Sequence, residues 1–170
     1  MKKIDWYLLL KIILVTELIG ILSGLFAGNT GQLYASFIKP PLSPPGWLFG
    51  VVWPVLYLLM GIAAYLIYQV PLSQERRQAI TLYWVQMFVN FLWPIAFFRF
   101  ERYGLSVAVI LILVVLVAMT TLRFWKLNKT AGYLMLPYLL WLLFATYLNI
   151  GVGSVELMQA LGASKACFFN

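Results

Sequence analysis

Apolar residues follow one another along this chain in five long runs, separated by short segments that carry most of the charges. A helix needs roughly 20 apolar residues to cross the hydrocarbon core of a bilayer. The pattern therefore predicts an all-α membrane protein, a bundle of five transmembrane helices. The expected spans are about 7–27, 47–68, 80–98, 105–122 and 131–152.

The first run allows a second interpretation, because Lys2 and Lys3 precede it as basic residues precede the apolar core of a signal peptide. The run is longer than the ~7–15 residues of such a core, and it carries Glu17 near its middle. We therefore expect a retained span rather than a cleaved leader.

Two segments outside the spans stand out. The longest connection, about 28–45, is expected to be stiff because proline fixes its own φ. Its prolines are Pro40, Pro41, Pro44 and Pro45. Residues 153–170 form a C-terminal tail to which the sequence assigns no role.

Composition agrees with the membrane assignment and removes several kinds of chemistry. Hydrophobic residues make up 64% of the 170 residues and charged residues 10%. So short a soluble chain cannot bury that much apolar surface in one core. The absence of histidine excludes imidazole-ligated haem, histidine zinc sites and Ser-His-Asp catalysis. No metal-ligand cluster or phosphate loop is found, and no metal site is expected.

The net charge of +7 comes from basic residues scattered between the apolar runs. In a membrane protein this pattern indicates topology and anionic headgroups rather than nucleic acid. Five spans place Lys2, Lys3, Arg76, Arg77, Arg123, Lys126 and Lys129 on one side. The other side holds Lys39, Arg99, Arg102 and Lys165. The positive-inside rule then predicts a cytoplasmic N-terminus, and the lack of an Arg- and Ser-rich transit sequence favours a bacterial cell membrane.

Three spans each present an aromatic side chain among polar or small neighbours on one helical face. Facing inward, such faces would enclose an aromatic-walled pocket typical of sites for flat apolar ligands. The residues are Trp53, Tyr57, Met60 or Gly61, and Ala64; Gln86, Asn90, Trp93 and Phe97; and Pro137, Trp141, Ala145 and Asn149 or Leu148, with Tyr138 beside them.

Packing explains the same residues in another way. Tryptophans near span ends belong to interfacial belts, and buried Asn side chains can bond between helices for about 0.6–2 kcal/mol. Trp53 and Trp141 lie deeper in their spans, where the belt explanation is weaker. Spacing alone leaves both the pocket and the packing interpretation open.

The first span also carries Gly20, Gly24 and Gly28 at a spacing that lets another backbone approach closely. We interpret this series as close packing within the bundle, with a homodimer face as the alternative. Glu17 is interpreted as a structural hydrogen-bonding group near an interface, with a proton-linked site as the alternative.

Four blocks, in this order and spacing, resemble the TspO/MBR family of tryptophan-rich sensory proteins and translocator proteins (peripheral benzodiazepine receptors). The similarity runs from the first span to about Ile150. The blocks are LYASFIKPPLSPPGW (33–47), VWPVLYLLMG (52–61), NFLWPIAFF (90–98) and PYLLWLLFATYLN (137–149).

The resemblance implies a five-helix bundle, usually a homodimer, whose ligand cavity lies beneath the first loop. It implies binding of porphyrins such as protoporphyrin IX and of related hydrophobic planar ligands, with no obligatory cofactor. The ligand-binding residues expected from the blocks and faces together are Tyr34, Trp53, Tyr57, Asn90, Trp93, Phe97, Tyr138, Trp141, Ala145 and Leu148.

The sequence departs from the family in two places. The first loop has Leu33 where the family usually has Trp beside Tyr34, which removes one stacking surface. Asn149 is not followed by the aromatic and basic residues of the proposed mammalian cholesterol motif, so sterol binding by that route is not expected.

Three functions follow from the resemblance. We expect a porphyrin-binding receptor or sensor first. Photo-oxidative porphyrin degradation, with Trp53 and Trp141 as the redox residues, comes second and leaves open whether the protein is an enzyme. Transport of porphyrin or another amphiphile comes third, because five helices without an inverted repeat argue against alternating access.

Overall fold

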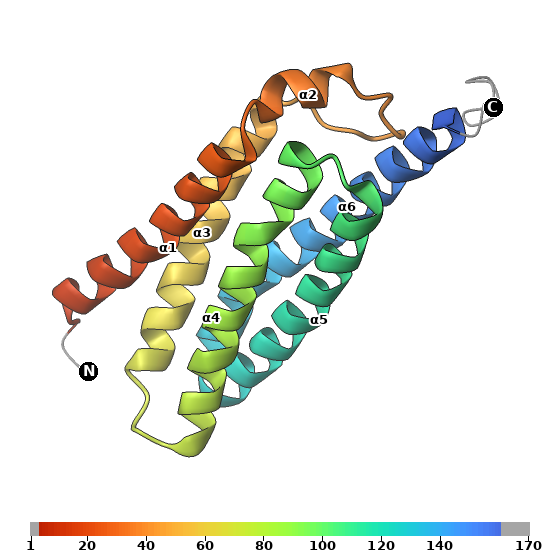
Figure 1. Ribbon diagram of the computed structural model, residues 1–170. Coiled ribbons are helices and arrows are strands. Elements are labelled where there is room, and N and C mark those ends of the chain that lie inside the picture. The colour runs from red at the N-terminus through yellow and green to blue at the C-terminus, as the bar shows by residue number, and fades with distance from the viewer. Residues whose placement is uncertain (1–3, 161–170) are drawn as a thin grey trace.

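A computed structural model describes residues 4–160 of the chain and confirms the all-α fold with five long apolar helices (Figure 1). Residues 161–170 of the expected tail lie outside the described part, as do Lys2 and Lys3. The helices are α1 (Trp6–Ala27), α2 (Thr30–Ser36), α3 (Trp47–Tyr68), α4 (Gln74–Pro94), the π-helical turn η1 (Ile95–Arg99), α5 (Tyr103–Leu127) and α6 (Lys129–Ala160).

Helix ends follow capping groups rather than the limits of the apolar runs. The Ser73 hydroxyl accepts a hydrogen bond from the backbone N–H of Arg76 at 3.1 Å, so α4 begins at Gln74, well before the apolar run at 80. The Asp5 carboxylate caps α1 in the same way, accepting from the Leu8 N–H at 3.0 Å. Hydropathy therefore locates the spans, while short polar side chains locate their first turns.

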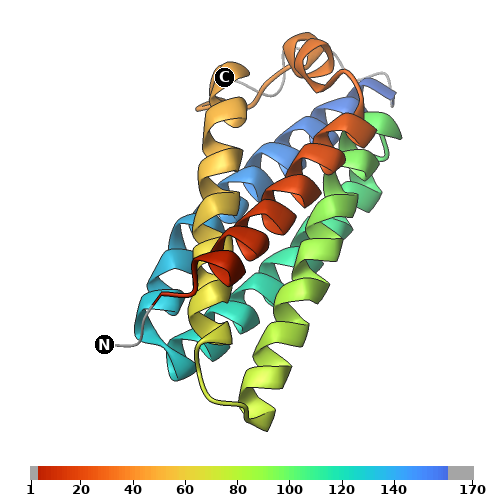
Figure 2. The same ribbon diagram turned by 90° about the vertical axis from the view of Figure 1, so that its left-hand side faces the viewer.

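The principal helix contacts form a closed ring in the order α1, α3, α6, α5, α4 (Figures 1 and 2). The helix α1 lies against the face between α3 and α4. Only 17% of the most apolar stretch of α1 is buried, against 44% in α3 and in α6. Within the single chain, α1 is thus the least enclosed helix of the bundle.

The first loop crosses one end of the bundle as a roof that contains the short helix α2 (Figure 1). The roof is fastened to α6: the Tyr147 hydroxyl donates to the Pro41 carbonyl at 2.7 Å. Beside this bond, a Cβ at Gly151 would lie 2.6 Å from Pro40 Cγ, so glycine lets the loop touch the helix. Contacts with α6 therefore hold the first loop in place, in addition to the stiffness expected from its prolines.

The end of α4 departs from a regular α-helix. Pro94 has no N–H to continue the ladder, and the following residues Ile95–Arg99 form a π-helical turn. The backbone N–H of Phe100 donates to the Ile95 carbonyl at 3.1 Å. This turn shifts the side chains after Pro94 away from the regular helical positions assumed for the span 80–98.

Candidate ligand cavity beneath the first loop

A cavity of about 260 Å³ lies beneath the roof, between α1, α2, α3 and the end of α4. Two kinds of residue form its walls. Aromatic rings come from α2, α3, α4 and η1, and small residues come mainly from α1, α2 and the beginning of α3. The aromatic residues are Tyr34, Phe49, Trp53, Tyr57, Trp93 and Phe98. The small residues are Gly20, Ser23, Gly24, Thr30, Gly31, Gly46 and Gly50.

The aromatic wall is built around Trp53. Its ring centroid lies 5.8 Å from that of Tyr57 and 6.2 Å from that of Trp93, with interplanar angles of 33° and 35°. Nearer the roof, Tyr34 meets Phe49 edge to face at 5.0 Å. Rings at these separations attract one another and present a polarizable surface to a flat ligand.

The small-residue wall creates the open space. A Cβ added at Gly24, Gly31 or Gly50 would have no atom within 4 Å, so these positions face empty volume. A Cβ at Gly20, in contrast, would overlap the ring of Tyr57. One glycine of α1 therefore allows close contact with α3, and the glycine one turn further on leaves the cavity open.

This placement decides how the glycine series is used within one chain. Gly20 packs against Tyr57, Gly24 borders the cavity, and Gly28 ends α1 with a φ of 84°. The series serves packing and the cavity inside the chain. Glu17 forms no hydrogen bond or ion pair with any side chain that the structure describes, so its expected structural hydrogen bond is absent there.

Polar groups near the cavity are few and partly unpaired. The Asn90 amide donates to the Tyr57 hydroxyl at 3.0 Å, which holds the Tyr57 ring in the wall. The Oδ1 of Asn90 and the Nε1 of Trp93 are buried without a partner in the described chain. A buried polar atom left unpaired costs free energy. The Trp93 Nε1, on a residue that lines the cavity, is therefore a suitable position for a ligand group, and the Asn90 Oδ1 behind Tyr57 for a bound water.

The Tyr34 hydroxyl forms a hydrogen bond within the roof, across the first loop. It donates to the Pro44 carbonyl at 2.7 Å. Burial raises the pKa of Tyr34 above its usual value, although a hydrogen bond with Ser43 opposes the shift. The hydroxyl consequently remains a neutral donor throughout the physiological range. Lys39 lies over the same ring, with Nζ 5.0 Å from its centroid.

Of the residues expected from sequence, Tyr34, Trp53, Tyr57 and Trp93 line the cavity together. Asn90 lies behind Tyr57 and positions it. Phe97 does not line the cavity; it is buried and stacks on Trp93 at 5.8 Å. The residues from α3 and α4 thus converge as their helical spacing indicated, apart from the shift introduced after Pro94.

The α6 residues form a second layer behind this wall rather than part of it. Tyr138 is fully buried, with its ring 6.3 Å from Trp53, and its hydroxyl donates to Gln86 Oε1 at 3.3 Å. Trp141 meets Phe49 edge to face at 5.7 Å, and its Nε1 is buried without a partner in residues 4–160. The two remaining positions, Ala145 and Leu148, are buried and absent from the cavity lining.

Two aromatic residues of the wall, Phe49 and Phe98, were missed by the sequence analysis. Phe49 precedes Trp53 by one turn, so extending the α3 face toward the loop would have found it. Phe98 lies within the π-helical turn, whose side-chain positions no regular helical spacing predicts. The glycines of α1 were recognised as a packing series, but nothing in their spacing indicated that one of them borders a cavity.

Similarity to known proteins agrees with this architecture. Residues 12–155 match the model of the TspO/MBR family. A tryptophan-rich protein TspO of Archaeoglobus fulgidus is 36% identical over 145 residues, covering 82% of this chain and 94% of that protein. A tryptophan-rich sensory protein of Cereibacter sphaeroides is 36% identical over 118 residues, covering 69% and 73%. The human translocator protein is 34% identical over 125 residues, covering 72% and 73%. The chain is therefore a multi-pass membrane protein that belongs to the TspO/MBR family.

Proposed function

We propose that this protein is a membrane receptor or sensor that binds porphyrins, protoporphyrin IX above all, and related hydrophobic planar ligands beneath the first loop. The observation that carries the proposal is the cluster of Trp53, Tyr57 and Trp93 on one wall of the cavity. A porphyrin macrocycle is planar, apolar and polarizable, and such ligands stack on indole and phenol rings. The family resemblance supports the same ligand class.

The size of the cavity shows what binding requires. Small-molecule sites usually measure about 300–1,000 Å³, and this cavity measures about 260 Å³. A macrocycle therefore needs additional space. The helix α1 can supply it by moving outward, because α1 is the least enclosed helix and faces the cavity with Gly24. The unpaired Trp93 N–H can then donate to a polar group of the ligand.

A titration tests the proposal. Purified protein is titrated with metal-free protoporphyrin IX while tryptophan fluorescence is followed. We expect saturable quenching in the wild type, and a dissociation constant about tenfold higher, or about 1.4 kcal/mol weaker, when Trp53 and Trp93 are both replaced by Phe. Trp125→Phe is the matched control, because Trp125 packs on Tyr133 and does not line the cavity. Equal affinities in the double variant and the control would contradict the site.

Photo-oxidative degradation of the bound porphyrin is the second candidate function. Trp53 favours it, because its ring lies within 6.3 Å of Trp93, Tyr57 and Tyr138, which can also be oxidised. Illumination of the complex in air should bleach the Soret band, and Trp53→Phe should slow the bleaching. Equal bleaching by an unrelated membrane protein would exclude the activity.

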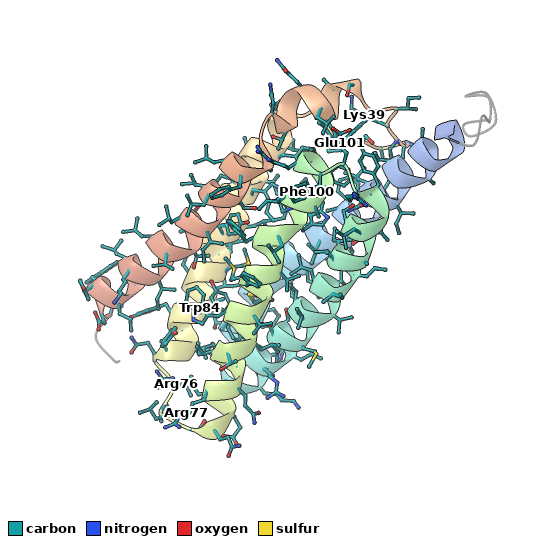
Figure 3. The ribbon with its side chains drawn as sticks, viewed as in Figure 1. Lys39, Arg76, Arg77, Trp84, Phe100 and Glu101 are labelled. Carbon is teal, nitrogen blue, oxygen red and sulfur yellow. The ribbon has the colours of Figure 1, made fainter. Side chains whose placement is uncertain are left out.

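We also propose that the N-terminus faces the cytoplasm of a bacterial cell. The end of the bundle opposite the roof carries Arg76 and Arg77, which Figure 3 labels, and Arg123, Lys126 and Lys129 where α5 ends and α6 begins. The roofed end carries Lys39 and Glu101, both labelled in Figure 3, and Arg99 at the end of η1 and Arg102 just before α5, on either side of Glu101. The positive-inside rule places the first end in the cytoplasm. In a Cys167→Ser background, Ser43→Cys should react with an impermeant maleimide on intact cells and Ser73→Cys should not.

The family resemblance also supports a homodimer, which we retain as a proposal. Within the chain Tyr57 covers Gly20, whereas Gly24 has open space in front of it, so Gly24 is the glycine of this series that a second copy could approach. Light scattering of the purified protein gives the oligomeric state directly. A dimer that survives Gly24→Leu would show that the contact lies elsewhere.

A further inference from the structure

A groove between α4 and α5, at the end of the bundle opposite the roof, is separate from the porphyrin cavity. Two adjoining hollows of about 320 and 480 Å³ share Met119 and Arg123. We call their combined surface the α4–α5 groove and define it by Arg77, Gln78, Val85, Met119, Arg123 and Lys126. Figure 3 shows Arg77 at this end of the bundle.

Three basic side chains meet at the outer end of the groove. Arg77 comes from the first turn of α4, and Arg123 and Lys126 come from the last turns of α5. Arg123 Nη1 donates to Gln78 Oε1 at 2.6 Å, which fixes the guanidinium across the groove and leaves its other N–H groups available. One acidic residue, Glu75, lines these hollows. It borders the larger hollow, which Lys126 also borders.

The charged and apolar residues are separated along the groove. Because α4 begins and α5 ends here, Val85 and Met119 lie deeper in the membrane than Arg77 and Arg123. The distance along α4 from Arg77 to Val85 is about 12 Å, at 1.5 Å for each residue. Val85 and Met119 are each 43% exposed, so the deep part of the groove offers apolar surface.

This arrangement matches one occupant. A phospholipid places an anionic phosphate at the membrane surface and its acyl chains in the hydrocarbon, and basic pockets between transmembrane helices bind such headgroups. Inorganic phosphate has the charge but gains nothing from the apolar walls. We propose that the α4–α5 groove binds an anionic phospholipid, with its phosphate held by Arg77 and Arg123 and an acyl chain on Val85 and Met119.

Native mass spectrometry of the purified full chain tests this site with phosphatidylglycerol and phosphatidylcholine of identical acyl chains. The test variant is Arg77→Gln with Arg123→Gln. The matched control is Arg76→Gln with Lys129→Gln, which removes the same charge at the same end; Arg76 instead lies 5.6 Å from the Tyr68 ring. Because each basic residue near an anionic surface contributes about 1 kcal/mol, we expect phosphatidylglycerol to bind the test variant about 30-fold more weakly.

The control should retain the wild-type preference for phosphatidylglycerol over phosphatidylcholine. A third variant, Met119→Trp, fills the apolar part of the groove without changing its charge, and it should also weaken phosphatidylglycerol binding.

Three results would overturn the proposal: equal binding of the two lipids by the wild type, full displacement of phosphatidylglycerol by inorganic phosphate, or lipid adducts on monomers but never on dimers. The second result would indicate a free-phosphate site, and the third a groove covered by a second copy of the chain. Porphyrin titration of the test variant should match the wild type, because none of its residues lines the cavity.

Discussion

The roofed half and the opposite half of this bundle are built from the same five helices, yet they pack differently. Beneath the roof, Gly24 and Gly50 leave empty volume beside Trp53. In the opposite half, which we call the closed half, Tyr83, Met87 and Phe124 have no exposed surface. Aromatic residues are plentiful in both halves. The comparison shows that small residues on α1 and α3, rather than the number of aromatic rings, open the cavity.

Buried polar atoms differ between the halves in the same way. In the closed half, the Tyr83 and Thr16 hydroxyls bond to each other at 2.9 Å. Four of the five unpaired buried side-chain atoms in the described chain lie toward the roof, and the fifth, on Gln86, adjoins Met87 of the closed half. These atoms belong to Gln86, Asn90, Trp93, Trp141 and Asn149. Unpaired groups are expected where a ligand or water completes the site.

Truncating one aromatic residue in each half gives the largest expected contrast. Phe124→Ala removes a ring that is fully buried and stacked on Tyr83 at 5.9 Å, and should lower the free energy of unfolding by about 3–5 kcal/mol. Phe98→Ala should cost less than about 2 kcal/mol, because Phe98 already borders empty volume. Thermal unfolding in detergent measures both. Equal losses would mean that the two halves are packed alike.

Replacing two glycines one turn apart on α1 separates packing from cavity volume. Gly20→Leu forces a side chain into the Tyr57 ring and should destabilise the protein by about 1–3 kcal/mol. In Gly24→Leu the new side chain enters open space, so the melting temperature of this variant should stay close to that of the wild type. It should instead weaken porphyrin binding about tenfold by filling the cavity. Unchanged porphyrin affinity in Gly24→Leu would place the ligand elsewhere.

Loosening the roof tests whether its anchor on α6 controls the roofed half alone. Tyr147→Phe removes the hydrogen bond to the Pro41 carbonyl, which contributes about 1 kcal/mol. Hydrogen exchange in the first loop should become about fivefold faster, with no change in the closed half. Tyr133→Phe, at the far end of α6, serves as the control. A uniform increase along the whole chain would indicate global destabilisation instead.

The smallest expected effect concerns the closed half. A double-mutant cycle of Thr16→Val and Tyr83→Phe isolates the hydrogen bond between α1 and α4. Interhelical bonds of this kind contribute about 0.6 kcal/mol in membrane proteins, and we expect a coupling energy of that size. A coupling energy of zero would show that this contact does not hold α1 in place.

The predictable part of this protein is what helical periodicity determines. Trp53 and Tyr57 share a face because they are one turn apart, and their convergence with Trp93 follows from facing inward. Periodicity gives the face of a helix but not the neighbour that covers it. For this reason Trp141 was expected in the wall and instead lies behind Phe49. Which helices enclose a space depends on tertiary packing.

Backbone details account for the other differences between expectation and structure. The helix α2 forms inside a proline-rich loop whose sequence indicated only stiffness. The π-helical turn after Pro94 brings Phe98 to the cavity and directs Phe97 to the back of Trp93. Both features depend on which backbone groups a few hydrogen bonds join. Hydrophobic patterning does not predict these backbone hydrogen bonds.

The closed half lies between the cavity and the opposite end of the bundle. Its Met60, Ile67 and Tyr83 have no exposed surface, so no open passage runs beside them. Passage of a ligand through the bundle would require these side chains to separate, whereas the proposed binding beneath the roof would require movement of the loop and α1 alone.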